Sequence, residues 1–141
     1  MRGLLVVCSF GAFIATGLVQ AGDAKKDQQG LQGTWKATFD DKKLLLTFKG
    51  DTFTFTMGDD KYQGTFKVDP SKKPKHINMT VKKGDKFVDK TSLGIYELKG
   101  NTLKWAANEP GKDVRPDEFR ETEGMLYVVL DRQKKKEKKP D

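Results

Sequence analysis

The sequence has little of the side-chain chemistry that metal sites and covalent mechanisms use. It contains one cysteine, Cys8, and one histidine, His76. Because Cys8 lies near the start of the chain, the part after residue 21 has no thiol for a disulfide or for thiolate catalysis. A lone histidine does not make a zinc or copper site, and we interpret His76 as an exposed strand residue. We predict that the protein holds no metal and no cofactor.

Nucleophiles for hydrolysis are equally scarce. After residue 21 the only serines are Ser71 and Ser92, and neither lies in a nucleophile-elbow pattern. No glycine-rich phosphate loop is present. The acidic pairs at 40–41 and 59–60 are typical of solvated turns. We predict that the protein is not an enzyme and has no catalytic residues; a hydrolase or isomerase built on the acidic stretch 108–124 is the least favoured alternative.

The longest uncharged segment of the chain, 3–22, lies at its start. Met1-Arg2 gives a positive start, the following residues carry no charge, and Ala21 fits a cleavage position. This pattern predicts a signal peptide over 1–21 and an exported protein, periplasmic or extracellular after cleavage. A retained membrane anchor is the alternative, because an uncharged stretch of 20 residues, 3–22, is long enough to span a bilayer. Residues 22–30, which are polar, are predicted to be a linker.

The positive charge gathers at the other end of the chain. The formal net charge is +7. The segment 133–141 has no large hydrophobic side chain and contains five lysines: Lys134, Lys135, Lys136, Lys138 and Lys139. Such a run predicts a disordered Lys-rich tail. It either serves solubility or makes weak contact with an anionic envelope surface. Nucleic acid is not predicted as a partner, because the chain has 23 Lys and only four Arg.

The body of the chain shows an apolar period of two, which indicates strands. Apolar side chains alternate with threonine and other polar residues in eight segments: 34–39, 44–48, 52–57, 62–68, 77–81, 93–98, 102–107 and 125–130. Short turn-like segments separate most of them, as in a meander of antiparallel strands. Closure into a barrel removes the exposed sheet edges. We therefore predict an all-β, eight-stranded antiparallel up-and-down barrel over 31–132.

Several motifs along this body resemble a known family. The segment 31–35, LQGTW, resembles the Gly-x-Trp opening of lipocalin-like barrels. Further segments, GTFKVD at 64–69, LGIYEL at 93–98 and RPDEF at 115–119, follow in order. Together they are similar to a family of small, exported, lipocalin-like proteins of uncharacterised function that is expanded in planctomycete bacteria. The resemblance implies a lipocalin-like fold and supplies no reaction.

The same resemblance implies a structural role for three residues. In lipocalin-like barrels the tryptophan of Gly-x-Trp plugs one end, and an arginine after the last strand packs across it. These positions correspond to Gly33, Trp35 and Arg132. We expect them to close the barrel through a cation-π contact.

The function favoured by the barrel is binding of a small apolar or amphipathic molecule. Its candidate ligand-binding lining is the set of apolar side chains expected to point inward: Phe53, Phe55, Tyr62, Phe66, Ile77, Met79, Tyr96, Leu103, Trp105 and Phe119. Eight strands enclose a space that side chains alone can fill. A plugged barrel that acts as an envelope interaction module, through its surface and basic tail, is therefore the alternative.

The irregular stretch 108–124 is longer than ordinary hairpin loops. As a lid it would place Phe119 over the barrel mouth, with Arg115 or Arg120 meeting an acidic ligand group. In the other interpretation, Phe119 anchors the loop to the core and the arginines pair with nearby acids.

Overall fold

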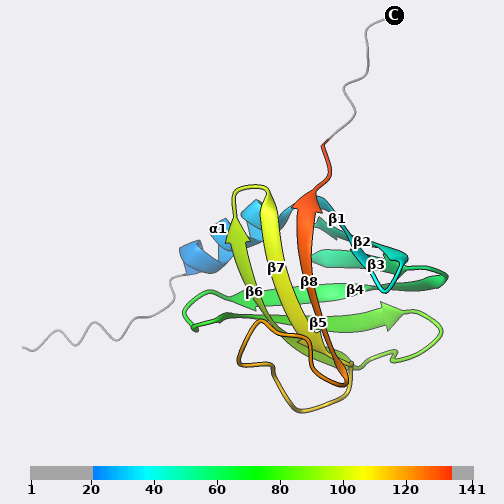
Figure 1. Cartoon of the computed structure of the whole chain (residues 1–141). Coiled ribbons are helices and arrows are strands. Elements are labelled where there is room, and N and C mark those ends of the chain that lie inside the picture. Colours follow the sequence, from blue (N-terminus) through cyan, green and yellow to red (C-terminus); the bar gives the residue numbers. More distant parts are fainter. Residues whose placement is uncertain (1–20, 135–141) are drawn as a thin grey trace, which may run out of the picture.

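The computed structural model describes residues 21–134, which form a closed antiparallel barrel with one short helix (Figure 1). Each strand pairs with the next along the chain, and the last pairs with the first. The predicted all-β, eight-stranded up-and-down barrel is confirmed. The elements are α1 (Ala21–Leu31), β1 (Gly33–Phe39), β2 (Lys42–Lys49), β3 (Thr52–Met57), β4 (Asp60–Asp69), β5 (Lys75–Lys83), β6 (Thr91–Lys99), β7 (Thr102–Asn108) and β8 (Met125–Arg132).

Alternating apolar residues fill the barrel interior. On β2, for example, the buried residues are Leu44, Leu46 and Phe48, and on β7 they include Leu103 and Trp105. Successive side chains of a strand point to opposite faces, so this alternation puts one apolar face inside. The core is therefore the barrel interior itself.

The pairing of strand β4 is irregular at Gly64. The pairing of β4 with β5 shifts its register between Gln63 and Gly64. A Cβ atom at Gly64 would overlap the carbonyl oxygen of Thr80 and lie 2.9 Å from the Phe53 ring. Glycine is required here because the backbone of β5 comes too close for any side chain.

The prediction of a linker over 22–30 is wrong, because this segment belongs to helix α1. Its sequence has no apolar stripe, so periodicity gave no sign of it. The helix is held by tertiary contacts instead: Leu31 is fully buried, and Gln28 Nε2 donates to Gly50 O at 2.8 Å. Asp27 Oδ2 accepts hydrogen bonds from Lys75 Nζ at 2.9 Å and Tyr96 Oη at 2.7 Å. The folded unit thus includes α1, which packs on the barrel as Figure 1 shows.

Trp35 and Arg132 close the barrel beside this helix. The Arg132 guanidinium lies 4.3 Å from the centre of the Trp35 ring, and Trp35 Nε1 donates to Leu31 O at 2.8 Å. Arg132 also donates to Gln32 O and Gly30 O, each at 2.7 Å. The predicted contact between Arg132 and Trp35 is confirmed. These contacts tie β1, β8 and the end of α1 together.

The two ends of the barrel differ. The helix end has α1 and the turns 50–51, 70–74 and 100–101, whereas the open end has the loops 40–41, 58–59, 84–90 and 109–124. Side chains and α1 fill the helix end.

In residues 21–134 no helix is long and apolar enough to cross a bilayer. The predicted signal peptide, apart from Ala21, and the predicted tail, apart from Gln133 and Lys134, lie outside the described residues.

Candidate functional site

A cavity of about 230 Å³ lies inside the open end of the barrel. Its walls are mostly apolar, because the inward faces of β3 to β8 meet there. The lining residues are Phe53, Phe55, Tyr62, Met79, Val81, Phe87, Ser92, Trp105, Ala107, Asn108, Glu109, Pro110, Gly124 and Leu126. The barrel is thus plugged at one end and hollow at the other.

Four aromatic rings form a continuous wall of this cavity. Phe55 on β3 is stacked with Tyr62 on β4, with ring centres 6.2 Å apart, because the two residues are paired across the strands. The Phe55 ring meets Trp105 edge to face at 5.9 Å, and Tyr62 meets Phe87 at 6.0 Å. Phe87 comes from the loop 84–90, where its φ is 67°. We call Phe55, Tyr62, Phe87 and Trp105 the aromatic wall.

Five of the ten candidate lining residues reach the cavity: Phe53, Phe55, Tyr62, Met79 and Trp105. Of the other five, Phe66, Ile77, Tyr96 and Leu103 are buried in the core without lining it. Phe66 packs on Phe48 with ring centres 4.6 Å apart, and the Tyr96 hydroxyl is engaged with α1. For these four residues the prediction of ligand contact is wrong, although each does point inward.

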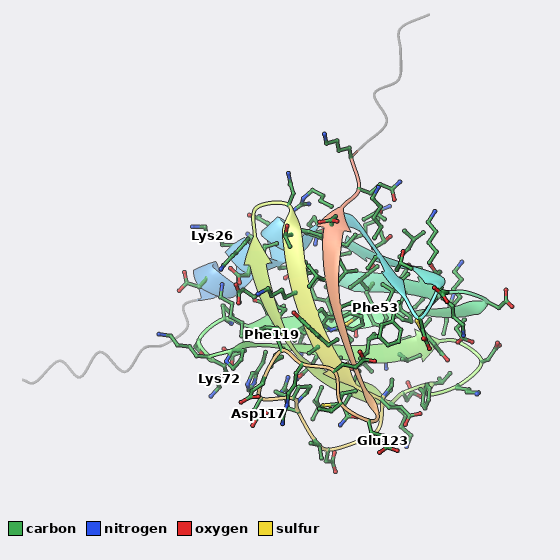
Figure 2. The ribbon with its side chains drawn as sticks, in the orientation of Figure 1. Lys26, Phe53, Lys72, Asp117, Phe119 and Glu123 are labelled. Atoms are coloured by element: carbon green, nitrogen blue, oxygen red, sulfur yellow. The ribbon has the colours of Figure 1, made fainter. Side chains whose placement is uncertain are left out.

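Phe119 does not cover the cavity mouth. Its ring packs against Tyr127 at 6.1 Å, and Tyr127 points away from the interior because Leu126 and Val128 point into it. Figure 2 shows Phe119 on the segment that runs across the strands below the centre of the view. Phe119 is therefore an anchor of the loop, as in the alternative interpretation, but it anchors the loop to the outer face of β8 and not to the core.

The two arginines of this loop are also away from the cavity lining. Arg115 donates to Gly94 O at 2.7 Å and to Asn78 Oδ1 at 2.6 Å, so its guanidinium fixes the loop to β5 and β6. Arg120 is exposed and lies 3.5 Å from Glu118. Neither is placed to meet an acidic ligand group in the cavity, and this prediction is wrong.

The loop 109–124 lies on an apolar outer strip of the barrel. Ile95 and Ala106 are paired across β6 and β7, and both are fully buried although neither belongs to the interior cluster. Residues on the outside of a strand become buried only under another segment. Arg115 pins this loop there, and in Figure 1 the orange segment crosses the lower ends of β6 and β7.

Polar groups at the cavity are few, and several are already bonded. Ser92 Oγ donates to Asn108 O at 2.6 Å, and the Asn108 amide bonds to Val114 O and the Glu109 backbone N–H. The indole N–H of Trp105 is buried and has no acceptor within residues 21–134. Glu109 is the only charged residue among those that line the cavity.

Three carboxylates act on the Tyr62 hydroxyl at the cavity. Burial raises the pKa of the Tyr62 hydroxyl, and the carboxylates of Asp60, Asp85 and Glu109 raise it further. Burial is the larger cause of this shift, and the three carboxylates add to it because ionisation of Tyr62 would bring a further negative charge near them. Glu109 lies 3.7 Å from Lys112 with both side chains about half exposed, so this ion pair is weak.

Sequence reasoning missed part of the lining. Val81, Phe87, Ala107 and Leu126 contribute to the cavity although none was a candidate. Phe87 carried a signal, because it is one of two apolar side chains in the charged loop 84–90. His76, expected to be exposed, is half-buried on β5.

Within the part of the chain that the structure describes, no three His, Cys, Asp or Glu side chains converge as metal ligands. No protein-family model matches the sequence, and neither the curated proteins nor the solved structures give a match.

Proposed function

We propose that this protein is an exported, non-enzymatic, lipocalin-like barrel that binds one small apolar or amphipathic molecule. The observation that carries the proposal is the apolar cavity at the open end. Small-molecule sites are typically concave and apolar, with a few polar groups that orient the ligand. Here Tyr62 and Glu109 are such groups at the mouth. The Gly-x-Trp opening and the segment 1–21 support the lipocalin-like family and export.

The cavity volume sets the size of the ligand. A dry apolar cavity of about 150 Å³ accommodates benzene, so a cavity of about 230 Å³ holds about nine non-hydrogen atoms by the same ratio. That is a two-ring or singly substituted one-ring compound. A long acyl chain would have to extend through the mouth into solvent.

Binding is favoured over catalysis by the groups that face this space. The hydroxyl of Ser92 and the amide of Asn108 are committed to backbone partners. A nucleophile needs a base within hydrogen-bond reach to be activated, and the lining residues offer no such pair around Glu109. These contacts support the proposal that the cavity holds a molecule without transforming it.

The first experiment is native mass spectrometry of residues 22–141 purified without denaturant from the native envelope fraction. A stoichiometric adduct of about nine or more non-hydrogen atoms is expected. Ala107→Leu, which adds atoms to the cavity wall, should remove the adduct, whereas Phe119→Ala on the outer face should retain it. A clean apo mass, together with no binding of any small aromatic probe by calorimetry, would contradict the proposal.

A second candidate, an envelope interaction module, is favoured by the distribution of charge. The loops of the open end carry eleven acidic and five basic residues, whereas the turns of the helix end carry one acid and two bases. In Figure 2 Lys26 lies beside α1, whereas Asp117 and Glu123 lie toward the lower edge of the view, away from this helix. The Lys-rich segment follows β8, which also ends at the helix end.

Anionic surfaces would therefore attract the helix end and leave the cavity mouth facing away. Sedimentation with phosphatidylglycerol vesicles should show binding at low salt that is lost near 1 M salt, where the Debye length is about 3 Å. Removal of residues 133–141 should abolish it. Binding that is insensitive to salt would exclude this role.

A further inference from the structure

We propose that the ligand of the open-end cavity is an organic cation, with its ammonium group held by the aromatic wall near Glu109. This inference depends on the proposed function and specifies its substrate class. It reverses the expectation from the sequence, in which arginines would have met an acidic ligand.

Aromatic rings make up much of the cavity wall. The rings of the aromatic wall form a row in which each packs on the next, in the order Trp105, Phe55, Tyr62 and Phe87, and all four line the same cavity. The face of an aromatic ring carries negative electrostatic potential, and tryptophan is the strongest of these rings as a cation partner. Cages of such rings recognise quaternary and methylated ammonium groups. A purely apolar ligand would be served equally well by leucine or valine.

Carboxylates near the cavity also favour a cationic ligand. Glu109 is the only charged residue of the lining, and Asp60 and Asp85 are close enough to act on the Tyr62 hydroxyl. The basic residue nearest to Glu109, Lys112, is 3.7 Å away and about half exposed, so it can move into solvent when a ligand cation arrives.

The cavity lining has no basic side chain that would bind an anion. Arg115 bonds to Gly94 and Asn78, and Arg120 lies beside Glu118, so neither is in the lining. Within the described lining no Lys, Arg or His is present. Lys112 lies beside Gly124 but is paired with Glu109, so a carboxylate or sulfonate inside the cavity would be desolvated without a cation of its own, which is unfavourable.

The test uses three probes of the same shape and nearly the same volume that differ in charge. These are phenyltrimethylammonium, neutral tert-butylbenzene and anionic benzenesulfonate. In calorimetry on residues 22–141, the cation should bind most tightly, the neutral probe less tightly and the anion most weakly. A cation-π contribution of about 2 kcal/mol in a desolvated site corresponds to an advantage of about 30-fold for the cation over its neutral isostere.

Two variants locate the effect. Glu109→Gln should lower the affinity for phenyltrimethylammonium about three- to tenfold and leave the affinity for tert-butylbenzene unchanged, because only the cation interacts with the lost charge. Glu118→Gln, on the same loop but outside the lining, is the matched control and should change neither. Tyr62→Leu should reduce the preference for the cation while a neutral probe still binds.

The outcomes separate this inference from the function on which it depends. If tert-butylbenzene binds as tightly as the cation, or benzenesulfonate binds most tightly, the inference of a cationic ligand is wrong and the proposed binding function stands. If none of the three probes binds to folded protein, both are wrong. A cation preference that survives both Glu109→Gln and Tyr62→Leu would place the cation elsewhere and overturn the assignment to this cavity.

Discussion

Truncation of Trp35 should destabilise the barrel strongly while leaving the cavity intact. The side chain is fully buried, its N–H donates to Leu31 O at 2.8 Å, and Arg132 lies on its ring at 4.3 Å. Tryptophan-to-alanine changes in cores cost about 3–5 kcal/mol. Because the hydrogen bond and the cation-π contact are lost too, we expect Trp35→Ala to lower the free energy of unfolding by about 4–5 kcal/mol.

A conservative variant divides this loss into parts. Trp35→Phe keeps an aromatic face under Arg132 but leaves Leu31 O without its donor, which should cost about 1–2 kcal/mol. In a domain of this size 1 kcal/mol changes the melting temperature by about 4 °C. Trp35→Ala should therefore melt about 16–20 °C below the parent, and Trp35→Phe about 4–8 °C below it.

The assay is urea unfolding followed by circular dichroism, with thermal melts in parallel. Val129→Ala, at a side chain that is 46% exposed, is the control and should lose less than about 0.5 kcal/mol. Phenyltrimethylammonium affinity, measured where each variant is folded, should stay within about twofold of the parent because distant sites act independently. A parent-like melting curve for Trp35→Ala would refute the reasoning, and so would a loss of affinity in the folded variant.

Three further predictions concern other parts of the barrel. Gly64→Ala should cost at least about 3 kcal/mol or prevent folding, because its Cβ would overlap a backbone carbonyl that cannot move aside. Asp27→Ala should cost about 2 kcal/mol in urea unfolding, since it removes the acceptor of the buried Tyr96 hydroxyl. The pKa of His76 is lowered by burial and by nearby Arg115, although Asp69 opposes this shift. The folded protein thus binds fewer protons than the unfolded chain, so stability should be full above about pH 6.5 and fall as the pH decreases below it.

Each of these has a discriminating control. Gly100→Ala, at a turn with open space but a positive φ, should cost only about 1 kcal/mol, and an equal loss at Gly64 would contradict the steric argument. If α1 does not dock in solution, Asp27→Ala and the parent will unfold at the same urea concentration. His76→Gln should flatten the decline in stability between about pH 7 and about pH 5; an unchanged decline would assign it to other groups.

The strands could be predicted from the sequence because each one buries a single face. On β3 the threonines between Phe53, Phe55 and Met57 make the period of two unmistakable. Helix α1 gave no such signal, since Leu31 is its only large apolar side chain. Its polar residues bind to Gly50, Lys75 and Tyr96, and the chain brings these partners together only in the folded state.

The site was predicted only in part, because periodicity reveals the face of a strand and says nothing of depth along it. Tyr96 and Trp105 both point inward and are paired across β6 and β7, yet only Trp105 reaches the cavity. The path of the loop 109–124 was equally hidden. The outward apolar residues Ile95 and Ala106 were its one sign, because an exposed outer face would carry polar side chains there.

The junction of β1 with β8 makes completion of the fold depend on the last strand to be synthesised. Only Trp35 with Arg132 and Lys36 with Asp131 are paired there, and they are nearly a hundred residues apart in the chain. Closing a loop of that length costs about 4 kcal/mol in chain entropy, and contacts so distant in sequence form slowly. Hydrogen exchange during refolding should therefore protect the Lys36 amide after those of the β2–β3 hairpin. A nascent chain that lacks Arg132 has no clamp for its own first strand, so the barrel reaches its stable form only after β8 has emerged.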